Sequence, residues 1–386
     1  MPKPLLISGA EIFADGEVLK RGDLLIQGGK IRKIAPKIKA SGAQVLSGRG
    51  LIAAPGLIDT QLNGGYGHSF SEAAPDRIHA VSRGLLAEGV TSYLPTLISL
   101  PRDVILKGIA SVVAAAKLKG GAEILGIHLE GPFLSAAKRG AHREANLRHP
   151  SPEELRAYVQ AARGLLRKMT LAPELPGALE TIREGRRRKV IMSAGHTTAN
   201  AVQFAMAVRA GVTHVTHCFN AMPPLHHRDP SALNAALVTD AVSCGFIYDR
   251  IHLHADAARL LLRSKPKGRA VLVSDAVAAM GMPDGDHEAD GALYEIKAGT
   301  VTVKGTGTLA GSARSILYGV RALVEDLGLS PAEAVACASA APARLLGLKT
   351  KGALRPGADA DVILLDGTLN VKNTFVRGEL LYGNHH

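Results

Sequence analysis

Four polar residues stand directly after apolar runs of the kind that form buried β-strands. Glu130 follows "ILGIHL", His196 follows "VIMSAG", His217 follows "THVT" and Asp275 follows "VLVS". One carboxylate and two imidazoles can bind a divalent cation and leave a position open for water; zinc suits this set, and iron, cobalt and manganese are tolerated. Such a cation lowers the pKa of water towards neutrality. Each residue alone would be taken for a structural histidine or a turn carboxylate, but four such endings together indicate a site.

Other histidines and a cysteine lie near these positions in the sequence. Successive residues of a strand point to opposite faces, so His214 and Cys218 are predicted to pack away from His217. His252 and His254, in "HLH", would share a face and by spacing alone are also a candidate metal pair. Spacing does not decide between this pair and the strand-end set.

A site of this kind needs elements that bring strand ends together. From Leu51 onward, short β-branched apolar runs alternate with helical patterns such as "SPEELRAYVQAARGLL", which indicates βα units and a parallel sheet. The eight runs cover residues 51–63, 90–97, 122–131, 168–175, 189–196, 212–220, 242–256 and 269–276. Eight such units close a (β/α)8 TIM-like barrel, in which catalytic groups lie at the carboxyl ends of the strands.

The two chain ends have a different pattern. Residues 1–50 and 353–386 contain short strands with turn signals such as "ADGEV", "QGGKI" and "LLDGTLN". They predict one small β-sandwich domain built from both termini, with the barrel occupying residues 51–352. Whether the terminal pair His385–His386 belongs to the natural chain is left open.

Three segments late in the barrel region have helix or loop signals. Residues 311–328 and 330–347 begin with serine signals and end near glycine, so they are expected to form helices outside the barrel. The Gly-rich stretch at residues 281–291 is expected to be a mobile loop.

The composition is that of a globular protein, and it indicates which classes of partner the protein is expected to bind. The 386 residues are 46% hydrophobic and 21% charged. There is no long apolar window and no leader pattern, so we expect a cytoplasmic protein without membrane contact. The formal charge of +12 comes from scattered basic residues without interleaved aromatics, so small phosphorylated substrates are favoured over nucleic acid. Its three cysteines, Cys218, Cys244 and Cys337, form no Cys-x-x-Cys pair, which argues against disulfides and a cysteine zinc site.

Several motifs occur in one order along nearly the whole chain. They are "PGLIDTQLNGGYG", "GIHLEGPFL", "KRGAH", "SAGHTTAN", "THCFNAM", "LVSDAVAAMG" and "GTLAGSA". In these motifs the sequence resembles the N-acetylglucosamine-6-phosphate deacetylases of the amidohydrolase superfamily. The resemblance implies hydrolysis of the N-acetyl group of N-acetyl-D-glucosamine 6-phosphate to D-glucosamine 6-phosphate and acetate, in amino-sugar catabolism or recycling.

The resemblance assigns the reacting residues. It implies that Glu130, His196 and His217 bind one divalent metal per subunit, zinc before iron, cobalt or manganese. Asp275 would act as general base on the metal-bound water and then as acid towards the departing amine. His142 would polarise the acetamide carbonyl and stabilise the oxyanion.

The resemblance also assigns the rest of the pocket. Backbone N–H groups of Asn220 and Ala221 would hold the phosphate with His252 and with Arg228 of the adjacent subunit, which implies a homodimer. Leu309, in "GTLAGSA", would line the sugar pocket; by itself that motif is only a glycine-rich turn. By the same alignment His254 is not a ligand.

One departure from the superfamily pattern concerns the metal count. Where many relatives have His-x-His on the first strand, this chain has Gln61 and Asn63, whose neutral amides bind transition metals weakly. A single-metal site is therefore expected, with Gln61 free to hydrogen-bond near the water or the substrate. His68 is expected to be a loop residue. The alternatives are an amidohydrolase for another N-acyl amino sugar or a cyclic amide, and a barrel that binds without catalysis.

Overall fold

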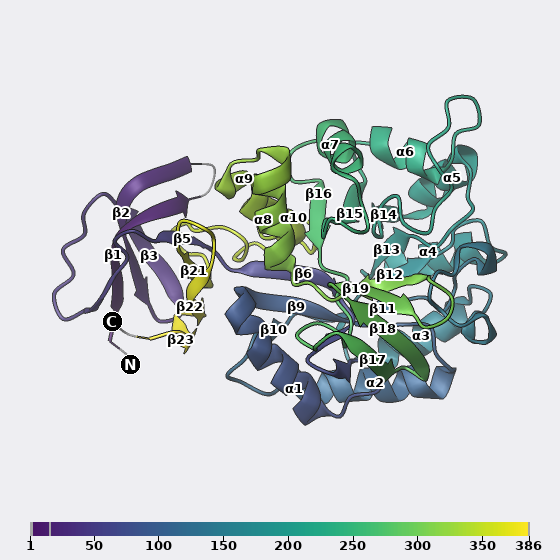
Figure 1. The fold of residues 1–386 in the computed structure, drawn as a ribbon, viewed down its shortest axis with the longest axis horizontal. Helices are drawn as coiled ribbons and strands as arrows, with labels where there is room; N and C mark the ends of the chain where they lie inside the picture. Colours follow the sequence, from purple (N-terminus) through teal and green to yellow (C-terminus); the bar gives the residue numbers. More distant parts are fainter. Residues whose placement is uncertain (1–2, 15–16, 385–386) are drawn as a thin grey trace.

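Eight parallel strands form a barrel in the computed structural model, which describes residues 3–14 and 17–384 (Figure 1). In barrel order they are β6 (Leu57–Leu62), β9 (Val90–Leu97), β11 (Ile127–Glu130), β12 (Leu166–Leu171), β13 (Ile191–Ala194), β14 (Val212–Val215), β15 (Ser243–Ile247) and β16 (Ala270–Val273). A bridge between Leu62 and Ala276, with the Asp275 N–H donating to the Gln61 carbonyl at 2.9 Å, closes β16 onto β6. The predicted (β/α)8 barrel is confirmed.

Helices cover the outside of the barrel, so its strands are buried on both faces. Every residue of β6 and β9 is buried. The helices are α1 (Pro75–Gly84), α2 (Arg102–Ala115), α3 (Pro152–Ala161), α4 (Ala178–Arg187), α5 (Ala201–Ala210), α6 (Ala232–Val238), α7 (Ala255–Ser264), α8 (Ile316–Leu327), α9 (Pro331–Cys337) and α10 (Ala340–Leu345), with 3₁₀ turns at Leu85–Glu88, Ala136–Lys138 and Glu144–Asn146. Ser315 and Ser330 cap α8 and α9. The helices predicted after residue 311 are therefore present, the second one split into α9 and α10.

A second sheet combines both ends of the chain. Its strands are β1 (Leu5–Ala14), β2 (Glu17–Gln27), β3 (Lys30–Ala35), β4 (Gln44–Ser47), β5 (Ile52–Pro55), β21 (Val362–Leu365), β22 (Val371–Val376) and β23 (Glu379–Tyr382). They enclose a separate apolar core that includes Ile7, Leu24 and Phe375. The predicted boundaries at residues 50–51 and 352–353 stay a prediction; β5 belongs to this sheet. Residues 1–2, 15–16 and 385–386, including the turn "DG" and the pair His385–His386, lie outside the described residues.

A third sheet, which the sequence analysis missed, follows the last barrel strand. It is antiparallel and contains β17 (Gly285–Ala289), β18 (Ala292–Lys297), β19 (Thr300–Val303) and β20 (Leu309–Ser312). The loop expected at residues 281–291 is thus wrong, because most of it is β17 and its turn into β18. Ile296, Val301 and Ala310 of this sheet pack with Ala279, which anchors the sheet to the segment after β16.

Short strand pairings lie beside the barrel. The short strand β10 (Glu123–Ile124) pairs with β9, and β7 (Gly64–Gly65) forms a hairpin with β8 (His68–Ser69). Within residues 3–14 and 17–384, no helix has the length and apolar character needed to cross a membrane.

Candidate active site

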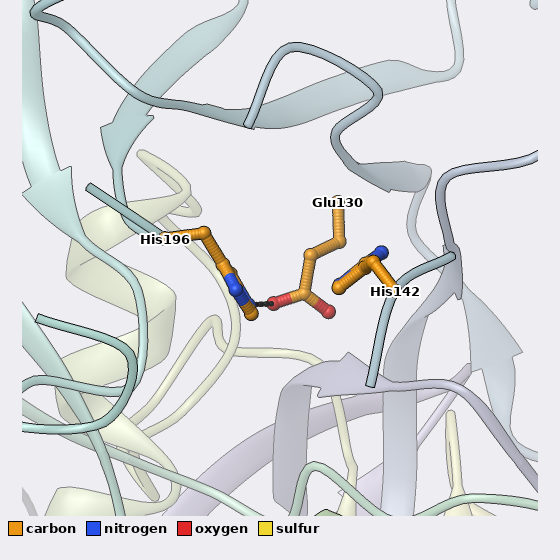
Figure 2. A group of neighbouring side chains, drawn as sticks. All are labelled: Glu130, His142 and His196. Atoms are coloured by element: carbon orange, nitrogen blue, oxygen red, sulfur yellow. Dashed lines mark ion pairs between the residues drawn. The ribbon is translucent and has the colours of Figure 1, made fainter. Parts of the chain in front are cut away.

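The donor atoms of three predicted ligands meet at one point. Glu130 is the last residue of β11, while His196 and His217 stand shortly after β13 and β14. The His217 Nε2 lies 3.0 Å from Glu130 Oε1 and 3.0 Å from His196 Nε2, and the third separation, His196 Nε2 to Glu130 Oε1, is 3.4 Å (Figure 2). Ligands bonded tetrahedrally to zinc at about 2.0–2.1 Å would lie roughly 3.3 Å apart. The spacing therefore fits one small cation.

The orientation of His196 is fixed from behind. Its Nδ1–H donates to the Lys138 carbonyl at 2.8 Å, which leaves the Nε2 lone pair directed at Glu130 and His217. The His196 and His217 rings are nearly perpendicular, with an interplanar angle of 77° and centroids 4.8 Å apart. A histidine held in this tautomer by a carbonyl is the usual arrangement for a metal ligand.

The charges of the three groups also suit a cation. All three side chains are buried. Burial raises the pKa of the Glu130 carboxyl, but the contacts with the His196 and His217 rings outweigh burial and hold this pKa well below its usual range. Glu130 is therefore a buried anion, which needs a nearby positive charge.

The His142 ring packs edge-to-face against the His196 ring, with the ring centroids 4.7 Å apart, and lies beside Glu130 (Figure 2). One side-chain donor atom from each of Glu130, His142 and His196 lies within 4.8 Å of the others. The backbone N–H of Ser99 donates to His142 Nδ1 at 3.3 Å, so the ring proton is on Nε2. Burial, followed by the charge of His196, lowers the pKa of His142 to about 3. His142 is thus a neutral hydrogen-bond donor.

The Asp275 carboxylate is held by two amides from β6 and its extension. Gln61 Nε2 donates to Asp275 Oδ1 at 3.0 Å and to Glu130 Oε1 at 2.9 Å, and Asn63 Nδ2 donates to Asp275 Oδ1 at 2.8 Å. Burial, with the nearby Glu130 charge, raises the pKa of Asp275 to about 6. A carboxyl group with a pKa in this range can both accept and return a proton near neutrality.

Backbone strain is concentrated at the same residues. His196, His217 and Asp275 have φ angles of 48°, 27° and 50°, in the left-handed region that side-chain-bearing residues rarely occupy. Glu174 secures the turn after His196, because its carboxylate accepts from the Thr198 N–H at 2.6 Å. The strand ends are therefore bent so that these side chains point over the barrel mouth.

Most predicted site residues line one cavity of about 430 Å³. Those in its wall are Glu130, His142, His196, His217, Asn220, Ala221, His252, Asp275 and Leu309. Gln61 is not in the wall, but it contacts two residues that are. Arg228 is exposed in the segment between β14 and α6 and does not line the cavity.

The end of the cavity assigned to phosphate differs in detail from the expectation. The Asn220 N–H donates to the His217 carbonyl at 2.9 Å, so this backbone group is already engaged. The side-chain Nδ2 of Asn220 is buried and the N–H of Ala221 has no acceptor in the described part of the chain. The turn directs the Asn220 N–H at the His217 carbonyl. The donors that remain free are therefore the side-chain amide of Asn220 and the backbone N–H of Ala221.

His252 and His254 do not form a metal pair. They follow β15 in a bend, and His252 donates its Nδ1–H to Asp249 Oδ2 at 2.9 Å, with its side chain 6% exposed. His254 caps α7, and its side chain is 80% exposed. Asp249 was missed by sequence reasoning, although it also follows a barrel strand.

The other histidines and cysteines are placed as follows. His214 is buried inside the barrel with Nδ1 2.8 Å from Ser193 Oγ, and Cys218 packs in the main core. His68, expected to be in a loop, lies in β8 and does not line the cavity. The three cysteines are free thiols.

The antiparallel sheet adds residues that the sequence analysis did not find. His287, Asp290 and Tyr294 from the β17–β18 hairpin line the cavity beside Leu309. The alternation in "ALYEIK" and "TVTV" was the available signal, but the surrounding glycines obscured it.

The chain belongs to the amidohydrolase family, whose profile matches residues 52–381. Among its relatives, the N-acetylglucosamine-6-phosphate deacetylase of Bos taurus is 40% identical over 389 residues, covering 95% of this chain and 93% of that protein. The N-acetylgalactosamine-6-phosphate deacetylase of Escherichia coli O157:H7 is 37% identical over 328 residues, covering 84% of this chain and 86% of that protein.

A solved structure agrees over the full length. It is an aspartate-to-alanine variant of the N-acetyl-D-glucosamine-6-phosphate deacetylase of Mycobacterium smegmatis in complex with N-acetyl-D-glucosamine-6-phosphate. The TM-score is 0.93 at 31% identity, and the match covers 98% of this chain and 100% of that one. The resemblance inferred from the motifs is confirmed.

Proposed function

We propose that the chain hydrolyses N-acetyl-D-glucosamine 6-phosphate to D-glucosamine 6-phosphate and acetate. The observation that carries the proposal is the convergence, at one end of a single cavity, of a Glu-His-His donor set with Asp275 and a neutral His142. Unengaged donors of Asn220 and Ala221 line the same cavity. The relatives that share the fold over its full length are named for this reaction.

Glu130, His196 and His217 would hold one divalent cation, which we propose to be zinc; iron, cobalt or manganese would also suit this donor set. A cation bound there polarises the amide carbonyl and lowers the pKa of water. The amide nitrogens of Gln61 and Asn63 donate to carboxylates, and their neutral amide oxygens bind transition metals weakly, which favours a single cation.

Asp275 moves the proton in this mechanism. Gln61 and Asn63 both donate to its Oδ1, which fixes the carboxylate while Oδ2 stays available. The carboxylate takes a proton from the attacking water and later gives it to the departing amine, because its protonation state alternates between the two steps. The pKa of Asp275, raised to about 6, suits both steps.

His142 binds the reacting carbonyl. Its Nε2–H donates to the acetamide oxygen, and this hydrogen bond strengthens as negative charge develops on that oxygen. The Ser99 N–H, by occupying Nδ1, keeps the proton on the atom that needs it.

The phosphate is held by Asn220, Ala221 and His252. Asp249 accepts the Nδ1–H of His252, and in the imidazolium form the Nε2–H of His252 donates to the phosphate. Leu309 lines the sugar-binding part of the cavity.

The enzyme acts as a homodimer in which Arg228 reaches the neighbouring cavity. Arg228 does not line the cavity of its own chain, and its segment packs on α5 through the Ala201 N–H, which donates to the Pro230 carbonyl at 2.9 Å. Large apolar side chains are exposed on α5 and on this segment: Val202 (68%), Met206 (41%) and Leu225 (49%). Exposed apolar side chains beside an unused guanidinium favour contact with a second copy.

Acetate release tests the proposal. The purified protein, with its metal content measured, is given N-acetylglucosamine 6-phosphate and, separately, N-acetylglucosamine. We expect strong preference for the phosphorylated sugar, loss of turnover on chelation and recovery with a divalent metal. Equal turnover of both sugars would remove the phosphate assignment, and no turnover with metal bound would remove deacetylation of this substrate.

A second candidate substrate is N-acetylgalactosamine 6-phosphate, which is favoured by the name of the Escherichia coli relative. The same assay with that sugar compares the two. In either case the enzyme is proposed to be cytoplasmic and to act on a small molecule, without nucleic acid or membrane as a partner.

A further inference from the structure

The β17–β18 hairpin forms one wall of the cavity. We call this hairpin the roof. His287 of β17 and Tyr294 of β18 are partners in the antiparallel register, and both line the cavity. Their sequence neighbours Glu288 and Glu295 are exposed. Because successive strand residues face opposite sides, His287 and Tyr294 form a cross-strand pair on the inner face of the roof.

The tip of the hairpin is fastened to the barrel. Ser69 Oγ donates to Asp290 Oδ1 at 2.6 Å, and the Asp290 N–H donates to Glu72 Oε2 at 3.1 Å. Arg143 Nη1 donates to the Gly291 carbonyl at 3.3 Å. These contacts hold the inner face of the roof in a fixed position above the ends of the barrel strands.

Both members of the pair have hydrogen-bonding capacity to spare. His287 Nε2–H donates to the Pro283 carbonyl at 2.9 Å, so Nδ1 is left as an acceptor. Burial, with the charge of Asp290, raises the pKa of Tyr294 to about 12, which keeps its hydroxyl neutral at physiological pH. The carboxylate of Asp290 itself is engaged by Ser69. The roof therefore presents one acceptor and one hydroxyl to the cavity.

Much of the remaining wall has no side-chain hydrogen-bonding group. It includes Ile98, Ala141, Ile247, Val277, Ala279 and Ala310. The metal end and the phosphate end use the other polar groups described above, which leaves Lys138 and Thr308 as further polar side chains in the wall besides the roof pair. A site that hydrogen-bonds a substrate hydroxyl discriminates strongly against an analogue that lacks or misplaces it, because its own polar groups are then left unpaired.

We propose that His287 and Tyr294 bind the ring hydroxyls of the sugar and determine which 4-epimer of the phosphorylated N-acetylhexosamine is hydrolysed. This inference rests on the proposed function. Relatives that share this fold are named for the gluco substrate and for the galacto substrate, which differ only in the direction of the hydroxyl at C4. In this proposal, His287 and Tyr294 distinguish the two directions of the C4 hydroxyl. The gluco epimer is expected to have the higher kcat/KM.

The test compares kcat/KM for the two sugar phosphates in the metal-loaded enzyme. Tyr294→Phe removes one hydroxyl and keeps the ring, and His287→Ala removes the acceptor. Each is expected to lower the ratio of gluco to galacto kcat/KM by at least about tenfold. Glu288→Ala and Glu295→Ala, on the outer face of the same hairpin, are the matched controls. If they loosen the roof, they should slow hydrolysis of both sugars equally and so leave the ratio unchanged.

The outcomes separate the inference from the proposed function. A ratio within about twofold of the wild-type value in both Tyr294→Phe and His287→Ala, with the wild type active, overturns the role of the roof pair and leaves deacetylation intact. A wild type that hydrolyses neither sugar with metal bound overturns the proposed function and the inference with it. A shift in the ratio that the outer-face controls share also overturns the role of the pair.

Discussion

The Nε2 atoms of His196 and His217 lie 3.0 Å apart, and each lies near the same oxygen of Glu130. Two imidazole lone pairs repel at this distance unless a proton or a cation lies between them. The proton of His196 is on Nδ1, where the Lys138 carbonyl accepts it. A cation bound between the two rings would accept a lone pair from each Nε2 atom.

Replacing one ring should remove the metal. Loss of an outer hydrogen-bond partner of a metal ligand lowers the metal affinity roughly 10–100-fold. In His217→Ala we expect a larger fall in metal affinity, because a ligand itself is lost. Elemental analysis after dialysis measures this, with acetate release measured in parallel. His254→Ala is the control, because that side chain is exposed at the start of α7. Full metal content in His217→Ala would exclude the residue as a ligand.

Asp275→Asn should separate catalysis from metal binding. The variant keeps the size of the side chain but removes the proton acceptor, so kcat should fall about 10²–10⁴-fold while the metal stays bound. Steady-state acetate release gives kcat, and elemental analysis gives the occupancy. Near wild-type kcat in this variant would mean that another group moves the proton.

Arg228 should act on the partner's cavity. When Asp275→Asn and Arg228→Ala chains are co-expressed with different tags, each mixed dimer contains one complete site only if Arg228 crosses the interface. Mixed dimers form about half of a random population, so activity should recover to roughly a quarter of the wild-type value. Recovery no greater than the sum of the two separate variants would show that Arg228 does not act in this way.

Lys168 gives a prediction on pH and stability. It is fully buried on β12 and its Nζ has no hydrogen-bond partner in the described residues. Burial, only partly offset by Glu130, lowers the pKa of Lys168 from 10.5 to about 8. From pH 8 to 10.5 the unfolded chain binds this proton and the folded chain does not. The free energy of unfolding should therefore rise with pH in this window.

Lys168→Met should abolish that rise. At pH 7 the variant should be more stable than the wild type by up to about 3 kcal/mol, because the charge that burial penalises is gone. Urea unfolding of both proteins from pH 7 to 10.5 makes the comparison. Parallel pH dependences in the two proteins would contradict a lowered pKa.

Replacing Lys351 should lower the free energy of unfolding, whereas replacing Lys168 should raise it. Its ammonium lies 2.5 Å from Asp361 and 2.7 Å from Glu123, with the side chain 5% exposed. Lys351→Met would leave Asp361 without its cation, although Glu123 would keep its ion pair with Arg377, and should cost about 3–5 kcal/mol of stability, measured by urea unfolding. Lys20→Met is the control, since Lys20 is 83% exposed beside Glu11 and should change little. Equal effects would argue against the buried ion pair.

The barrel and its rim were predictable because their signals are local. Each barrel strand is an apolar β-branched run, and a polar residue at its end must lie on the rim, as Glu130 and Asp275 do. The roof was not predictable in this way, because its strands are only partly buried and glycines interrupt them.

Details that depend on dihedral angles were also out of reach of the sequence. The pattern "THCFNAM" places Asn220 beside the metal site, but only the turn geometry shows that its N–H bonds to the His217 carbonyl. The same holds for His196, whose tautomer depends on a carbonyl from the distant Lys138. Residue types specify which groups are available, and the backbone decides which of them are free.

The first and last strands of the chain belong to one sheet. Figure 1 shows β1 and β23 at the left of the molecule, while β11, β13 and β14, at whose ends the three donor residues stand, lie to the right of centre. A tether attached beyond either strand would hold the molecule by the end remote from the cavity. The protein could therefore be fixed to a solid support through either terminus while its cavity remains open to the passing solution.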